Sequence, residues 1–325
     1  MHSSEPLLPP VSNLTEYMLL FARGSVWGQA MWAICQRHGL PMDRLLRFGD
    51  GTDLAFGSNV VFAVGDQLVI KLFPPFRKNL FDADLSVAEH VFGKLRVTTP
   101  EIYGHGELDG WPYLVMSRVH GVYLSEIWDT LDDESQLRMV IELAEVVAQL
   151  HVVSTDGLPL LENDWPRIVT TRIKTCVERH REQEVSDYWL EQIPDYLAYA
   201  APLYPADFSP AIISGDIHQY HLIVTQDNGR WRLTGLFDFD DALIGFQEYD
   251  LAAAGLFMMA GKPALLRAFL LAYGYTEAEV DERLSYRFMA YTLLHRYRPF
   301  NWVREDYAKG GSRTLEEVAR VIYAV

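Results

Sequence analysis

The stretch Ile213-Ser214-Gly215-Asp216-Ile217-His218-Gln219-Tyr220-His221-Leu222-Ile223-Val224 decides the fold, together with Leu236-Phe237-Asp238-Phe239-Asp240-Asp241, which follows shortly after it. The apolar residues before Asp216 predict a strand that delivers this carboxylate into a tight loop, and the apolar run after His221 predicts a returning strand. A turn at Asp227-Asn228-Gly229 leads into a third strand, which ends on Asp238. We therefore expect Asp216 and Asp238, 22 positions apart in the sequence, to face one cleft.

Two carboxylates in one cleft suit phosphoryl transfer. One can accept or orient the proton of a substrate hydroxyl, and the other can hold Mg²⁺ on the phosphates of ATP. Either aspartate alone would more simply be the solvated end of a β-hairpin. The placement of both at the ends of Val-, Ile- and Leu-rich runs favours the catalytic interpretation.

These residues resemble the catalytic region of the aminoglycoside phosphotransferase family, which has the protein-kinase fold and includes macrolide and small-alcohol kinases. The family pattern is His-Gly-Asp, four residues, Asn, then Ile-Asp-Trp or Ile-Asp-Phe, Gly, and Tyr-Asp-Leu-Ala. The resemblance implies that Asp216 orients the acceptor hydroxyl, that Asp238 binds the metal and that Asp250 braces the catalytic loop. The matching positions here are Ser214-Gly215-Asp216, His221, Phe237-Asp238-Phe239, Gly245 and Tyr249-Asp250-Leu251-Ala252.

Two positions depart from the family pattern. Ser214 replaces a histidine that supports the loop by hydrogen bonding, and a hydroxyl can provide a shorter-reaching version of that support. His221 replaces the asparagine that supplies an oxygen ligand to the metal, as it does in the macrolide phosphotransferases, which this loop also resembles. Imidazole is a poorer ligand than an amide oxygen for hard Mg²⁺, so Mn²⁺ is a possible alternative metal at Asp238 and His221.

The region before the catalytic motif is predicted to be rich in strands. We expect a helix over residues 14–38, strands over 45–48, 60–64 and 68–73, and a helix over 82–95. Gly65-Asp66 is predicted to form a two-residue hairpin turn. The order of these elements matches the small lobe of a protein-kinase-like fold.

The family resemblance implies a nucleotide site in this lobe. Lys71 would contact the α- and β-phosphates and would be held by Glu89, while Ser58, in Phe56-Gly57-Ser58-Asn59, could approach the β-phosphate. The segment Tyr113 to Gly121 resembles the hinge that binds the adenine ring. There the carbonyl of Ser117 and the amide of Val119 are the candidate contacts.

Residues from 124 onward are predicted to be mainly helical, and His151 at the end of an apolar helical stripe is expected to be a satisfied core histidine. In the family, helical insertions and C-terminal helices form the acceptor pocket. The sequence does not rank the candidate acids for this pocket, which are Glu162, Asp164, Asp281, Glu282, Glu305 and Asp306.

The composition fits an α+β, bilobal, protein-kinase-like protein. At 325 residues we expect a small lobe over 1–116 and a larger catalytic and acceptor-binding lobe over 117–325. The net charge of −16 argues against nucleic-acid and anionic-membrane partners. Residues 121–210 carry 17 acidic and six basic side chains, so a cationic acceptor is expected, although a solvated helical surface would explain the imbalance equally well.

Targeting and redox features are few. Cys35 and Cys176 are the only cysteines and are expected to be buried free thiols, which fits a reducing cytoplasm. No uncharged apolar run reaches the ~18 residues of a spanning helix, and the most apolar segment, 251–260, is expected to be a core helix.

Together these features predict an ATP-dependent small-molecule O-phosphotransferase acting on an aminoglycoside-like or macrolide-like antibiotic. A kinase of an amino alcohol or sugar amine is an alternative. A nucleotide-binding module without turnover is another, because Ser214 and His221 depart from the family pattern.

Overall fold

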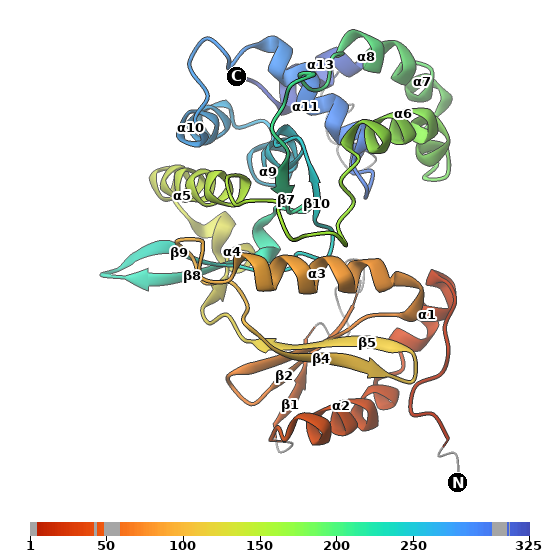
Figure 1. The fold of residues 1–325 in the computed structure, drawn as a ribbon. Coiled ribbons are helices and arrows are strands. Elements are labelled where there is room, and N and C mark those ends of the chain that lie inside the picture. The colour runs from red at the N-terminus through yellow and green to blue at the C-terminus, as the bar shows by residue number, and fades with distance from the viewer. Residues whose placement is uncertain (1–4, 42–43, 49–58, 301–310, 312) are drawn as a thin grey trace.

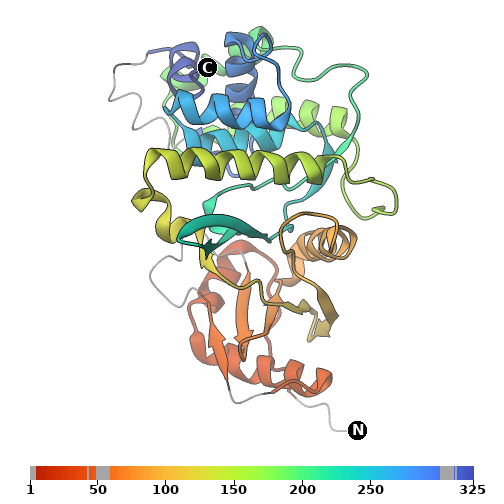
Figure 2. The same ribbon diagram turned by 90° about the vertical axis from the view of Figure 1, so that its left-hand side faces the viewer.

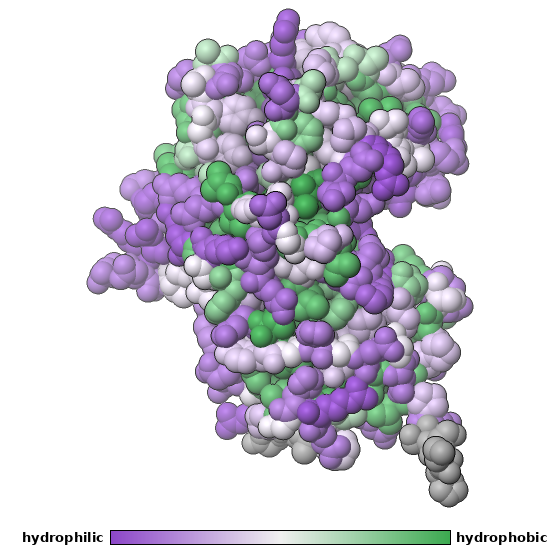
Figure 3. Space-filling model, in the orientation of Figure 1, coloured by the Kyte–Doolittle hydropathy of each residue, from purple (hydrophilic) through white to green (hydrophobic). Residues whose placement is uncertain are grey.

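The computed structural model describes residues 5–41, 44–48, 59–300, 311 and 313–325. The chain forms a strand-rich lobe and a larger helical lobe, with helix α3 (Lys78–Val91) lying where the two meet (Figure 1, Figure 2). The surface is notched between the lobes on one side (Figure 3). The architecture is the expected α+β, kinase-like one. The expected boundary between residues 116 and 117 stays a prediction.

The strand-rich lobe is built on a five-stranded antiparallel sheet in the order β1-β2-β3-β5-β4. Alternate side chains of a strand point to opposite faces. Ile70 and Leu72 of β3 therefore pack with helices on one face, whereas Lys71 points to the other face, toward α3. The strands are β1 (Leu45–Arg47), β2 (Val60–Val64), β3 (Leu68–Leu72), β4 (Ile102–Leu108) and β5 (Trp111–Ser117).

Three expected elements in this lobe differ in detail from the structure. The helix predicted over 14–38 is two helices, α1 (Leu14–Phe21) and α2 (Gly24–His38). The carbonyl of Phe21, where the first helix ends, accepts hydrogen bonds from Trp27 and Arg47 at 3.4 and 2.9 Å. The loop between β2 and β3 has three residues, 65–67, because Val64 pairs with Leu68.

The third difference concerns the position of a helix in the sequence. Helix α3 begins at Lys78 and ends at Val91, so it lies four residues earlier in the sequence than predicted. A short 3₁₀ turn, Pro75–Arg77, follows the strand-ending prolines and leads directly into it. Phe92 has extended ψ and Gly93 has a φ of 69°, which ends the helix before residue 95.

The helical lobe contains most of the apolar core. Helix α9 carries the Tyr249-Asp250-Leu251-Ala252 motif and is buried almost throughout, which confirms the expected core helix in this region. The helices are α4 (Leu124–Ile127), α5 (Asp133–His151), α6 (Trp165–Arg181), α7 (Asp187–Leu190), α8 (Ile193–Tyr199), α9 (Glu248–Met259), α10 (Pro263–Tyr273), α11 (Glu282–Leu294) and α13 (Leu315–Ile322).

Two small sheets carry the catalytic motif. β8 (Leu222–Asp227) and β9 (Arg230–Leu236) form the predicted hairpin, and β6 (Val122–Tyr123) pairs with β8. The strand before Asp216, β7 (Ala211–Ile213), does not pair with β8 and instead pairs with β10 (Leu243–Gly245). Asp216 and Asp238 therefore follow strands of two different sheets, rather than lying in a single hairpin.

Two further expectations are confirmed. Cys35 and Cys176 are buried and unbridged, Cys35 in the small lobe and Cys176 on α6. None of the helices in the described ranges has both the length and the apolar character needed to cross a membrane.

Candidate active site

Asp216 and Asp238 lie on either side of His221. The His221 ring approaches the Asp238 carboxylate at 3.4 Å through Nε2 and the Asp216 carboxylate at 4.0 Å through Nδ1. Asp238 has a φ of 70°, a left-handed conformation that aspartate tolerates better than most residues. The two carboxylates, 22 positions apart in the sequence, are therefore brought to the same ring.

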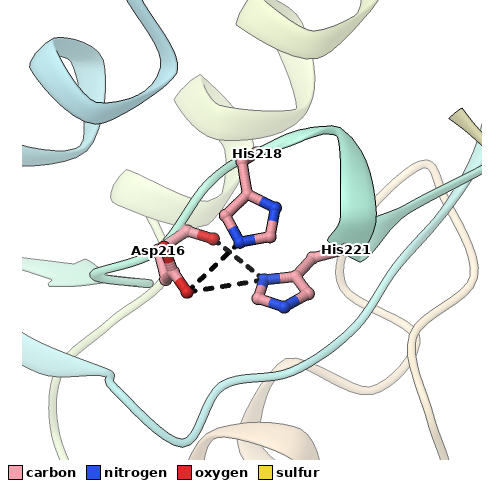
Figure 4. Close-up of side chains that lie close together, drawn as sticks. All are labelled: Asp216, His218 and His221. Carbon is pink, nitrogen blue, oxygen red and sulfur yellow. Dashed lines mark hydrogen bonds and ion pairs between the residues drawn. The ribbon is translucent and has the colours of Figure 1, made fainter. Parts of the chain in front are cut away.

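The histidine tautomers follow from their backbone partners. His221 Nδ1 lies 3.0 Å from the carbonyl oxygen of Asp216, which can only accept, so in the neutral ring Nδ1 carries the proton and the Nε2 lone pair faces Asp238. His218 Nδ1 accepts from the Tyr220 N–H at 3.1 Å, so in the neutral ring Nε2 carries the proton and donates to Asp216 Oδ2 at 3.3 Å. Both rings approach Asp216 (Figure 4).

These tautomers give the two rings different roles. Asp216, His218 and His221 are close enough together to suggest a metal site. However, both histidines present an N–H to Asp216, and a protonated nitrogen cannot ligate a metal. His218 thus orients the Asp216 carboxylate, whereas His221 Nε2 and Asp238 are the atoms suited to share a metal ion.

Asp250 supports the catalytic loop, as the family resemblance implies. Its fully buried carboxylate accepts hydrogen bonds from the Ser214 and Gly215 N–H groups, both at 2.8 Å. His151 lies 3.1 Å from the same carboxylate and 2.8 Å from the Tyr273 hydroxyl, which confirms it as a satisfied core histidine. A buried carboxylate with three such partners fixes the backbone just before Asp216.

His295 is a site residue that the sequence analysis missed. It follows α11, is buried, and its Nε2 lies 3.2 Å from the Gly215 carbonyl oxygen, 80 positions away in the sequence. Its ring stacks on Tyr249 at 5.2 Å. The catalytic loop, which has Ser214 in place of the family histidine, thus receives an imidazole from a different element. No local sequence pattern singles out His295.

Lys71 pairs with Asp84 and not with the expected Glu89. Its Nζ lies 2.6 Å from Asp84 and 2.7 Å from Asp238, and 3.1 Å from Asp240. Asp84 lies on the face of α3 that is turned toward β3. Glu89, five residues further on a helix of 3.6 residues per turn, is exposed on another side.

The charges around Lys71 are unbalanced, since three carboxylates surround one ammonium group. Burial opposes the charge of Lys71, but Asp238, Asp240 and Asp84 raise its pKa well above the ordinary value. Burial also raises the pKa of Asp240 and of Asp84. For Asp238, Lys71 and His221 outweigh burial and lower the pKa. The excess negative charge and the donor atoms of Asp238 and His221 fit a divalent cation.

Comparison of the sequence with known protein families agrees with the site described above. Residues 55–285 match the model of the phosphotransferase enzyme family, which is well over half of the chain. The chain belongs to this family. Its fold is that of solved aminoglycoside phosphotransferases. APH(2″)-IIIa in complex with GDP and kanamycin matches with a TM-score of 0.61 and 19% identity, over 85% of this chain and 93% of that one.

Two other solved structures match this chain about equally well. The complex of APH(2″)-IIa with streptomycin and ATP matches with a TM-score of 0.60 and 15% identity. The complex of an APH(4)-Ia mutant with ADP and hygromycin B has a TM-score of 0.60 and 18% identity. Both matches cover 89% of this chain and 97% of the other chain.

The segment that the sequence predicts to be the hinge follows the end of β5. Ser117 ends β5, and its N–H donates to the Glu101 carbonyl at 2.8 Å while its hydroxyl accepts from the Glu101 N–H. Val119 follows and packs against Gly235 of β9. The predicted adenine contacts of Ser117 and Val119 stay predictions. Ser58 lies outside the described residues.

A cavity of about 340 Å³ opens beside the catalytic loop of this phosphotransferase. Gly215, next to Asp216, lines it together with residues of α3, α6 and the segment 240–243. Of the candidate acids, Glu162 is at this cavity, whereas Asp164 and Asp281 cap helices and Glu282 pairs with Arg320. Glu305 and Asp306 lie outside the described residues.

Proposed function

We propose that this protein is an ATP-dependent O-phosphotransferase that phosphorylates a hydroxyl group of a small molecule. The observation that carries the proposal is the arrangement of Asp216 and Asp238 on the two sides of His221, with Lys71 bonded to Asp238. The acceptor side and the phosphate side of an in-line transfer each have a carboxylate, and the lysine lies on the phosphate side.

Asp216 has the properties of the residue that orients the hydroxyl. Burial would raise its pKa, but the hydrogen bond from His218 and the charge of His221 lower it. Asp216 is therefore ionised near neutral pH and can accept a hydrogen bond from the attacking hydroxyl. The hydroxyl oxygen forms a bond to the γ-phosphorus, the bond to the leaving oxygen of ADP breaks, and the hydroxyl proton passes to Asp216 and then to solvent.

Lys71 is placed to bind the α- and β-phosphates, and Asp84 keeps it on the cleft side of β3. Asp238 and His221 Nε2 would hold Mg²⁺ or Mn²⁺, which would neutralise charge on the phosphates. A mixed carboxylate and imidazole donor pair favours Mn²⁺ more than two oxygen donors would. Most of the acceleration would come from positioning and electrostatics, because phosphoryl transfer requires no covalent bond between the protein and the substrate.

The acceptor that we propose is a polyhydroxylated small molecule. Kanamycin, streptomycin and hygromycin B, which occupy the similar structures, are of this class. An antibiotic and a metabolite with several hydroxyl groups are both compatible with the catalytic geometry.

The proposal is tested by measuring ADP release with ATP and Mg²⁺ or Mn²⁺ across a panel of aminoglycosides, macrolides, sugars and polyols. Asp216→Asn is the control for chemistry, since it removes the hydroxyl-orienting carboxylate without touching Lys71. We expect acceptor-dependent ADP release that the variant loses. Tight ATP binding with no release for any acceptor would instead identify a nucleotide-binding module without turnover.

A further inference from the structure

Three arginines line the cavity beside the catalytic loop, and none of them has a role in the proposed reaction. Arg172 and Arg179 both belong to α6, two turns apart and therefore on one face of the helix. Arg296 follows α11. The opposite wall is formed by Asn79 and Ala83 of α3, so the cavity lies between the two lobes.

Most of the other charges in the cavity have partners. Arg296 forms an ion pair with Asp241, whose second oxygen accepts from the Tyr297 hydroxyl. Asp240 is bonded to Lys71 and to the Asn59 amide. Glu162, the remaining acid of the lining, is exposed. Among the described residues, neither of the two α6 arginines forms an ion pair with an acid of the lining.

Arg172 and Arg179 have no carboxylate partner in the part of the chain that the structure describes. Arg172 lies over the Tyr249 ring, 4.9 Å from its centroid, and its Nη1 is buried without a hydrogen-bond partner there. Arg179 donates from Nη2 to the carbonyl oxygens of His295 and Arg296. Burial, together with the charges of Arg298 and Arg172, lowers the pKa of Arg179.

Two guanidinium groups in one cavity repel each other unless an anion binds between them. Guanidinium binds carboxylates and phosphates through paired N–H donors, and such charge-assisted bonds are strong where water is excluded. A cavity of about 340 Å³ is large enough for a small polyol that carries one such group.

We propose that the acceptor carries an anionic group, a carboxylate or a phosphate monoester, which binds between Arg172 and Arg179. This inference rests on the proposed function, because it takes the cavity as the acceptor site. Gly215 lines the cavity and Asp216 is the next residue, so a polyol anchored on α6 can extend a hydroxyl toward Asp216.

This inference departs from the expectation of a cationic acceptor, which stays a prediction. Of the 17 acidic residues between 121 and 210, all but Glu142 and Glu145 are exposed, and Glu162 alone lines the cavity. Two of the six basic residues in the same range line it as well. The acidic balance of this region is therefore mainly a property of the solvated surface, whereas the α6 wall of the cavity carries two arginines.

The test is calorimetric binding of four polyols of matched size, without nucleotide. Gluconate and sorbitol 6-phosphate are anionic, sorbitol is neutral and N-methylglucamine is cationic. We expect at least one of the two anions to bind about tenfold or more tightly than sorbitol, and N-methylglucamine to bind no better than sorbitol. The anion that binds more tightly distinguishes a carboxylate site from a phosphate site.

Arg172→Gln should remove the preference for the anion, and Lys174→Gln is the matched control because Lys174 is an exposed cation on the same helix. Arg172→Lys keeps the charge and should retain part of the preference if Arg172→Gln proves unstable. With ATP analogue bound, the preferred anion should still bind, because Lys71 would then be occupied by phosphate.

Equal binding of all four polyols, or a preference for N-methylglucamine, would overturn the inference whether or not the protein turns over ATP. Loss of the preference in Lys174→Gln, or its disappearance when the ATP analogue binds, would also overturn it. Anion binding at Arg172 without any ADP release would leave the anion site in place and contradict the proposed enzyme. The two proposals can therefore fail separately.

Discussion

His295 and His180 should make the stability of this phosphotransferase fall between pH 7 and pH 5. Burial lowers the pKa of each ring to about 4. Around His295, the charges of Arg172 and Arg179 add to this effect, while that of Asp216 opposes it. In the unfolded chain, each ring would take up a proton near pH 6.5.

The direction follows from proton linkage. A histidine whose pKa is lower in the folded state contributes stability that is fully present above about pH 6.5 and is lost as the pH falls toward 4. At pH 5 the unfolded chain holds roughly one proton more for each of these rings. At about 1.4 kcal/mol per pKa unit, the interval from pH 6.5 to pH 5 removes about 2 kcal/mol for each histidine.

The assay is urea unfolding followed by tryptophan fluorescence at pH 7 and pH 5, for the wild type and for His295→Gln. Glutamine keeps a donor for the Gly215 carbonyl but does not titrate, so the loss between the two pH values should shrink by about 2 kcal/mol. His105→Gln is the control, since His105 is exposed on β4. A His295→Gln variant that loses as much stability as the wild type would refute the reasoning.

Three predictions concern the catalytic site. Asp216→Asn should lower turnover by roughly two orders of magnitude or more while nucleotide affinity, measured by calorimetry, stays near that of the wild type; near-normal turnover would remove this residue from the mechanism. Asp238→Ala should abolish metal-dependent turnover, whereas His221→Asn should retain it and shift the preference from Mn²⁺ toward Mg²⁺ in a metal titration. Equal insensitivity of both variants would show that the metal binds elsewhere. Asp84→Asn should weaken nucleotide binding about tenfold or more by releasing the lysine of β3, while Glu89→Gln should leave it unchanged; the reverse result would restore the pairing expected from the sequence.

Local sequence patterns were sufficient for the catalytic strands and for the class of fold. The apolar runs before Asp216 and Asp238, the turn at 227–229 and the lysine within an apolar strand are all short-range signals, and the structure has these elements at the predicted places. The role of Asp250 was also predicted, because its motif is contiguous in the sequence and resembles that of the family.

The partners of these residues were decided by tertiary structure. Asp84 and not Glu89 lies beside Lys71, because a separation of five residues places the two side chains about 140° apart around a helix of 3.6 residues per turn. His295 reaches the catalytic loop from 80 positions away, and no local pattern reports a contact of that range.

The charge of the cavity shows the same division between sequence and structure. Composition gives the acidic balance of residues 121–210, but a count of charges does not tell which of them face solvent. Folding turns the acids outward and brings Arg172 and Arg179 of α6 into the cavity beside Gly215. Screening by water makes the many exposed carboxylates weak, whereas two guanidinium groups in a confined space act at short range, which is why we propose that they select the acceptor.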